Sequence, residues 1–152
     1  MKVRQRFLLF CCLFIFLINL ITFPVLAQVT NCDLYEEVFA LEIPTYRVSL
    51  QGGSTLSIKV AYRLSPDAIA SRDYPDSISL QKSINEFFKT YSNKNEYWEI
   101  VNKNLVQFLL EQYSQISSLR VELNIMPTLQ EPFHRSSIIT STRPQACQIS
   151  HY

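Results

Sequence analysis

The stretch from Asn93 to Pro127 constrains the fold of this chain more than any other part of its sequence. In its first half, apolar residues recur three and four positions apart, which predicts an amphipathic helix. The predicted stripe consists of Trp98, Val101, Leu105, Phe108 and Leu109. In its second half, apolar and polar residues alternate from Leu119 to Met126, which predicts a half-buried strand that Pro127 ends. Such a helix and strand need a larger sheet and a helical layer to pack against.

The limits of this helix can also be predicted. Asn93 lies three residues before Glu96, which resembles a capping box and predicts that the helix begins there. The polar segment from Ser114 to Ser118 predicts its end. Further apolar residues widen the stripe, namely Ile100, Val106, Leu110 and Tyr113. We therefore expect this helix to be covered on more than one side, by the sheet and by another helix or another subunit.

Two further alternating segments, 46–50 and 56–64, predict a pair of strands. The only two glycines of the chain, Gly52 and Gly53, lie between them. Because glycine adopts positive φ without steric cost, the chain is expected to turn back at this point.

The length of that turn follows from the apolar pattern. A two-residue loop would place the two apolar rows on opposite faces of the hairpin and leave it without a core. We therefore expect a loop of three or five residues with a bulge. In that register Leu50 pairs with Leu56, and Val48 pairs with Ile58.

The segment before the hairpin is ambiguous. Residues 33–44 have apolar positions at helical spacing, yet the run from Val38 to Ile43 is equally consistent with the start of a strand. Pro44 confines any strand that passes through it to a sheet edge or a bulge.

Another helix is predicted after a connection rich in proline, aspartate and serine at residues 65–76. Its apolar stripe consists of Leu80, Ile84, Phe87, Phe88 and Tyr91. Asp76, Ser77 and Ser79 are its candidate N-terminal caps.

A last, weaker strand is predicted at residues 136–142, through Ile138 and Ile139. The order of elements is then strand, strand, helix, helix, strand, strand. This order predicts an α+β fold, in which a four-stranded antiparallel sheet carries both helices on one face.

Residues 1–27 have the features of a secretory signal peptide. Three basic residues precede an apolar run, and Val25 and Ala27 supply the small residues of a cleavage site. The alternative is an uncleaved membrane anchor, because residues 7–27 are long enough to span a bilayer. We expect cleavage, which leaves residues 28–152 as a single secreted or periplasmic domain.

The net charge of the chain without this segment limits the classes of molecule that it is expected to bind. Residues 28–152 keep 11 of the 14 Lys and Arg residues and all 13 Asp and Glu residues, for a net charge of −2. No basic stripe remains, so we predict no nucleic-acid partner. A membrane is a predicted partner only through an uncleaved signal.

Two cysteines follow the predicted signal, Cys32 and Cys147. In an oxidising compartment such a pair is expected to form a disulfide. Closing so long a loop would stabilise the fold by about 4 to 5 kcal/mol in the chain-entropy model. The alternative, a redox-active pair, lacks the close spacing that lowers the pKa of a thiol.

Few residues have the spacing of a known catalytic or metal site. The two histidines, His134 and His151, have no cysteine or carboxylate at metal-ligand spacing, so we predict neither a metal nor a cofactor. There is no glycine-rich phosphate loop and no nucleophile elbow. Glu99 is the one carboxylate of interest, because it lies in the first turn of the second predicted helix. Its ordinary role there would be to interact with the positive end of the helix dipole.

The order of elements and the run from Tyr97 to Pro127 resemble the tunnelling fold, in particular the dihydroneopterin aldolase family. The resemblance implies that a carboxylate early in the second helix anchors a pterin ring, and Glu99 falls at that position. It also implies that the following strand ends in a Lys-Pro pair whose lysine transfers protons. Residues 135–143 are similar to the closing strand of the family.

The sequence departs from the family at the residues that perform the reaction. Met126 occupies the position of the lysine and cannot carry a proton. The expected tyrosine falls at or near Leu80, and the acid-bearing connection between the first two strands is reduced to residues 51–54. Loss of one positioned acid-base group costs about 100- to 10,000-fold in rate. The resemblance therefore implies the scaffold and a ring-binding carboxylate without the aldolase reaction.

Two functions from different classes remain open from the sequence, and an enzyme of unrecognised type is a third. The first is a non-catalytic protein-interaction or structural module, whose apolar helix and aromatic residues contact another chain. The second is an oligomeric protein that holds a pterin- or purine-like heterocycle against Glu99 between subunits. We favour the first, because a binding module needs no residue that the sequence lacks.

Overall fold

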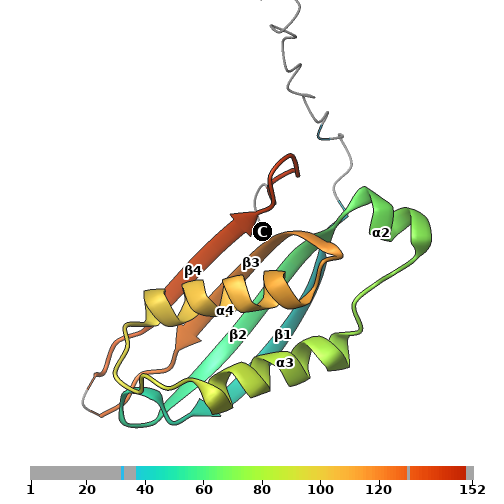
Figure 1. The fold of residues 1–152 in the computed structure, drawn as a ribbon. Helices are drawn as coiled ribbons and strands as arrows, with labels where there is room; N and C mark the ends of the chain where they lie inside the picture. Colours follow the sequence, from blue (N-terminus) through green and yellow to red (C-terminus); the bar gives the residue numbers. More distant parts are fainter. Residues whose placement is uncertain (1–31, 33–36, 130, 150–152) are drawn as a thin grey trace, which may run out of the picture.

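The computed structural model describes residue 32, residues 37–129 and residues 131–149. The elements follow in the order β1 (Phe39–Val48), η1 (Leu50–Gly52), β2 (Ser54–Leu64), α2 (Pro66–Ser71), α3 (Ser77–Thr90), α4 (Trp98–Gln112), β3 (Ile116–Ile125) and β4 (Arg135–Thr142). The strands pair antiparallel in the order β1-β2-β3-β4. Helices α3 and α4 lie across one face of this sheet (Figure 1). The predicted α+β fold, with its order of elements and its single helical layer, is confirmed.

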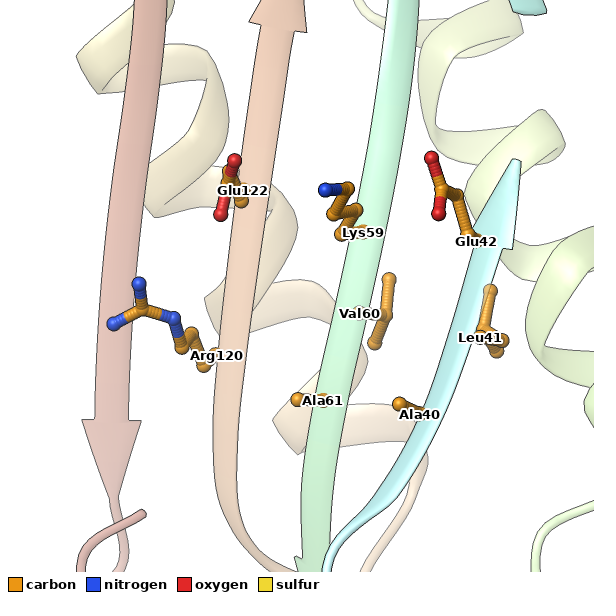
Figure 2. A pocket seen from close by; sticks show the side chains of 8 residues that line it. All are labelled: Ala40, Leu41, Glu42, Lys59, Val60, Ala61, Arg120 and Glu122. Carbon is orange, nitrogen blue, oxygen red and sulfur yellow. The ribbon is translucent and has the colours of Figure 1, made fainter. Parts of the chain in front are cut away.

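The core lies between the sheet and these two helices. The most deeply buried side chains alternate along β2 and β3 and meet the apolar stripes of α3 and α4. They include Leu56, Ile58, Val60, Leu119, Val121, Leu123, Leu80, Ile84, Leu105 and Leu109. Burying one such side chain stabilises the fold by about 1.5 to 3 kcal/mol. The other face of the sheet carries no helix in the described part of the chain, and Figure 2 looks onto this open face.

The loop between β1 and β2 has the predicted length, but the predicted pairs are wrong. Val48 pairs with Ser54, and Tyr46 pairs with Leu56, which leaves the five residues 49–53 in the loop. Leu50 is not in the ladder because it turns inward in the short helix η1, where it is 1% exposed. Burying Leu50 beneath the turn thus moves the register by four residues while keeping its parity.

The bulge lies in β1, at the position of Pro44. The register shifts between Ile43 and Tyr46, so that Ile43 pairs with Ile58. Because of the shift, odd-numbered residues of β1 face the helices before the proline (39, 41 and 43), and even-numbered residues face them after it (46 and 48). All five apolar side chains thereby point to the core. Pro44 is tolerated because β1 is an edge strand, as the sequence predicted.

The connection before α3 differs from the prediction. Residues 65–76 were expected to be a loop, yet they contain α2, whose N-terminal cap is the Ser65 side chain and whose first residue is Pro66. Serine followed by proline is a helix-start signal that the sequence already contained. Asp76 caps α3 as predicted, since its carboxylate accepts a hydrogen bond from the Ser79 backbone N–H.

Helix α4 begins later than the predicted capping box. Its N-terminal cap is Tyr97, and the Asn93 side chain donates to the Glu96 carboxylate at 2.7 Å instead of binding the helix backbone. The segment before the helix is held to the hairpin loop. Gln51 donates its backbone N–H to the Lys94 carbonyl at 2.7 Å and its side-chain amide to the Glu96 carbonyl at 2.8 Å.

The disulfide between Cys32 and Cys147 is present, with its Cα atoms 5.7 Å apart. It links the segment before β1 to the tail after β4. The predicted signal peptide at residues 1–27 lies outside the described residues. Among the helices of the described part, none combines the length and the apolar character needed to cross a membrane.

Candidate functional site

Glu99 lies in the first turn of α4, and its side chain is exposed. The side of α4 on which Glu99 lies follows from the side on which Phe108 lies. The Phe108 ring packs against Phe87 of α3, with 5.6 Å between the centroids. Nine residues separate Glu99 from Phe108, which is two and a half helical turns. Glu99 therefore lies on the flank of α4 that points away from α3.

This flank lies along strand β4. The Asn102 side chain donates to the Ser137 carbonyl at 2.9 Å, and near the far end of the helix the Arg143 guanidinium donates to the Leu110 carbonyl. Helix α4 and strand β4 therefore run in the same direction. Three residues before Asn102, Glu99 lies towards the start of β4.

Three buried polar atoms near this end have no hydrogen-bond partner among the described residues. They are Trp98 Nε1, Asn102 Oδ1 and Arg135 Nε, which are two donors and one acceptor. Trp98 is 3% exposed and Asn102 is fully buried. Each buried polar group without a partner costs about 1 to 3 kcal/mol. The first two turns of α4 therefore carry one exposed carboxylate and two buried polar groups that would gain free energy from a polar partner.

Asn102 was not identified from the sequence. Because it lies four residues after Trp98, the predicted stripe does place it on the buried side of the helix. What the sequence does not contain is the identity of its partners, which are backbone carbonyls of two different strands, Val121 and Ser137.

Strand β4 leaves an edge of the sheet open. No described strand pairs with its outer side, and residues 136–142 include neither a proline nor a charged residue. The opposite edge, β1, is blunted by Pro44, the bulge and Glu42. An unprotected edge strand is a surface on which another strand can pair. The candidate site at Glu99 thus adjoins an open edge.

The positions that depart from the family pattern are well defined. Met126 follows directly after β3, is half-buried, and donates its backbone N–H to the Thr55 carbonyl at 2.9 Å. Leu80 is completely buried in α3. Neither side chain can exchange a proton, so each of the two positions lacks the group that the resemblance associates with the aldolase reaction.

Other sequence candidates do not join this site. His134 is exposed in the loop before β4, and His151 lies outside the described residues. Within the described residues there is no group of three or more His, Cys, Asp and Glu side chains that could hold a metal ion. Burial raises the pKa of Tyr46 and of Tyr62, so neither phenol is poised to exchange protons at neutral pH.

A separate hollow of about 390 Å³ lies on the open face of the sheet (Figure 2). It is lined by Ala40, Leu41, Glu42, Lys59, Val60, Ala61, Arg120 and Glu122. Glu99 is not among these residues, because it lies on the helical side of the sheet.

Comparison with known proteins identifies solved structures that share this fold. No family model matches the chain, and no curated protein matches it by sequence. Among solved structures, dihydroneopterin aldolase from Escherichia coli in complex with neopterin aligns with a TM-score of 0.56 at 12% identity, over 70% of this chain and 99% of that chain. The enzyme from Burkholderia thailandensis bound to guanine aligns with a TM-score of 0.55 at 12% identity, over 70% of this chain and 91% of that chain. A putative dihydroneopterin aldolase from Vibrio cholerae aligns with a TM-score of 0.53 at 13% identity, over 72% of this chain and 100% of that chain. This chain therefore has the fold of dihydroneopterin aldolase.

Proposed function

We propose that this protein binds a planar pterin- or purine-like heterocycle through Glu99. The supporting observation is the start of α4, where the exposed Glu99 directly follows Trp98 and lies three residues before Asn102, and the buried Trp98 Nε1 and Asn102 Oδ1 atoms have no hydrogen-bond partner among the described residues. Two structures with the same fold hold neopterin and guanine. Both molecules have an amino group beside a ring N–H, and a carboxylate can accept both hydrogen bonds at once.

The site would be completed by a second copy of the chain. In one copy Glu99 is open to water, where a charged hydrogen bond to a ligand gains little free energy. Pairing of another chain along the open edge of β4 would cover this flank of α4 and exclude water from the bound ring. The proposed binding protein is therefore a homo-oligomer.

Binding in this proposal does not lead to the aldolase reaction. Met126 stands where the resemblance places the lysine, and the position of the tyrosine falls at or near Leu80. Without a positioned acid-base group at either position, proton transfer to and from the ligand would be slower by about 100- to 10,000-fold for each missing group. We therefore propose a role in holding the heterocycle.

The proposed location is outside the cytoplasm. The disulfide between Cys32 and Cys147 supports an oxidising compartment, because such bonds are rare where thiols are kept reduced. Together with the features of residues 1–27, it supports export to the periplasm or beyond. An anchor formed by residues 7–27 remains the alternative to cleavage.

A second candidate function is a non-catalytic protein-interaction or structural module. It is favoured by large apolar side chains exposed near the same edge. Tyr97 is 72% exposed, Ile100 is 43% exposed and Phe133 is 57% exposed. A partner protein that packs on these side chains would use this end of the molecule without any heterocycle.

Calorimetric titration of the purified, disulfide-bonded protein with neopterin and with guanine separates the two functions. We expect saturable binding of at least one of them, lost in Glu99→Gln and kept in Glu111→Gln, which changes an exposed carboxylate elsewhere on α4. Full affinity in Glu99→Gln would remove the proposed anchor. A monomer that binds neither compound and co-purifies with no ultraviolet-absorbing ligand would favour the interaction module.

A further inference from the structure

The hollow on the open face of the sheet has a floor of two alanines. Ala40 of β1 pairs directly with Ala61 of β2, and both side chains point away from the helices. Directly paired residues have Cβ atoms about 4.5 to 5.5 Å apart, so the two methyl groups form one small apolar surface. Longer side chains on the neighbouring positions rise around it (Figure 2).

These longer side chains carry two positive and two negative charges. Glu42, Lys59 and Glu122 form one row across the three strands, because Glu42 pairs with Lys59 and Lys59 pairs with Glu122. Arg120 lies on the same face of β3, opposite Ala61. Figure 2 shows all four side chains on this face, with Lys59 reaching from β2 towards β3 and Arg120 reaching from β3 towards β4, away from the two alanines.

The charges are only partly used within the protein. The Glu42 carboxylate accepts a hydrogen bond from the Ser57 hydroxyl at 3.3 Å, through one of its two oxygens. The Glu122 carboxylate likewise accepts one from the Asn124 amide at 2.9 Å. Lys59 and Arg120 form no hydrogen bond or ion pair with any other described residue. Lys59 and two carboxylate oxygens are thus available around the alanine floor, and the Arg120 guanidinium can reach it by a change of side-chain rotamer.

The balance of charge selects the kind of ligand. A simple anion would be attracted by Lys59 and Arg120 but repelled by the two carboxylates, and a simple cation would meet the reverse. A zwitterion can place its negative group at the cations and its positive group at the carboxylates. A volume of about 390 Å³ lies within the range of ligand pockets, about 300 to 1,000 Å³, and suits a small molecule.

We propose that this hollow binds a free α-amino acid with an apolar side chain. The ligand carboxylate is held by Lys59 and by Arg120, whose side chain turns back towards Ala61 on binding, and its ammonium group is held by Glu42 and Glu122. Its side chain lies on the methyl groups of Ala40 and Ala61. The site is independent of Glu99, which lies on the other side of the sheet.

Methyl resonances test this directly. The full chain is labelled with ¹³C at its alanine methyl groups and titrated with L-valine, L-leucine and L-phenylalanine. We expect saturable shifts of Ala40 and Ala61 with at least one of them, while Ala68 and Ala70 in α2 stay unchanged. For the ligand that binds, the analogues without its ammonium group and without its carboxylate are expected to bind about tenfold more weakly. For leucine these are 4-methylpentanoate and 3-methylbutan-1-amine.

Single substitutions test which charged residue binds which charged group of the amino acid. Lys59→Gln should weaken the amino acid about tenfold and leave binding of the amine analogue unchanged, and Glu122→Gln should weaken the amino acid without weakening the acid analogue. Ala61→Leu should abolish binding by filling the floor, whereas Thr55→Leu, on the same face of β2 outside the hollow, should not. Arg47→Gln is the matched control for the loss of a positive charge on this face.

The proposal is overturned if none of the three amino acids shifts Ala40 and Ala61. Analogues that bind as tightly as the amino acid would also overturn it, because the hollow would then not recognise both charges. Since Glu99→Gln leaves this face intact, failure here and failure of heterocycle binding are separate results.

Discussion

The side-chain amide of Asn102 on α4 donates a hydrogen bond to the backbone carbonyl of Ser137 on β4, at 2.9 Å. The same nitrogen lies 3.1 Å from the carbonyl oxygen of Val121 on β3. One buried side chain thus attaches the helix to two strands at once. This attachment places the first turn of α4, with Glu99, beside the open edge of β4.

Replacing Asn102 with aspartate tests this attachment. The variant would bring a carboxylate against two carbonyl oxygens in a fully buried position, so we expect a loss of more than about 3 kcal/mol in the free energy of unfolding. Urea titration at neutral pH measures it. Asn104→Asp is the matched control, because Asn104 is half-buried and donates to the Tyr91 hydroxyl, which can itself donate to a carboxylate. Equal losses in the two variants would contradict the attachment.

The disulfide gives a second test of stability. Cys32 and Cys147 are separated by 115 residues, so reduction should cost about 4 to 5 kcal/mol in the chain-entropy model. We expect the same loss in the double variant Cys32→Ser/Cys147→Ser without reductant. Denaturant midpoints with and without reductant measure both. A double variant as stable as the oxidised protein would show that the bond does not constrain the chain.

The two glycines of the hairpin loop should respond differently to substitution. Gly52 has φ +78° and Gly53 has φ +99°, and a Cβ added at either meets no atom within 4 Å. Any cost is therefore one of backbone conformation. We expect Gly52→Ala to cost about 1 to 2 kcal/mol and Gly53→Ala to cost more, up to about 3 kcal/mol. Thermal unfolding of the two variants measures the difference, and a neutral Gly53→Ala would contradict the described turn.

Asp76 should make stability depend on acid pH. The Ser79 backbone N–H and hydroxyl hydrogen-bond its carboxylate, and this lowers the pKa of Asp76 below its ordinary value of 3.8. A carboxyl with a lower pKa in the folded chain stabilises the fold above the unfolded value, and the contribution is lost as pH falls through the folded value. We expect the stability difference between the natural protein and Asp76→Asn to be constant from about pH 5 to 7 and to shrink below about pH 4. A difference that stays constant in acid would exclude this cap as its origin.

The fold could be predicted from the sequence because its main elements have unambiguous periods. The alternation from Leu119 to Met126 and the stripe of α4 each allow one burial pattern. The bulge at Pro44 was harder to predict from the sequence. Its signal was the change of apolar parity from Ile43 to Tyr46, which matters only once the partner strand is known.

The sites were less predictable than the fold. Glu99 was identified through the position of a carboxylate in a family pattern. Asn102 is one more polar residue in a helix until the carbonyls it contacts are known. The hollow depends on Ala40 lying opposite Ala61, and that pairing follows from the five-residue loop and the bulge together.

Glu99 is the central residue of the proposed heterocycle site, and Trp98 offers a direct probe of it. Trp98 is the only tryptophan in the chain and the immediate neighbour of Glu99. Titration with neopterin and, separately, with guanine, followed by Trp98 fluorescence, should give saturable quenching with at least one of them in the natural protein and in Glu111→Gln, and with neither in Glu99→Gln. Quenching of equal strength and affinity in Glu99→Gln, or no saturable quenching in the natural protein, would contradict the proposed binding site.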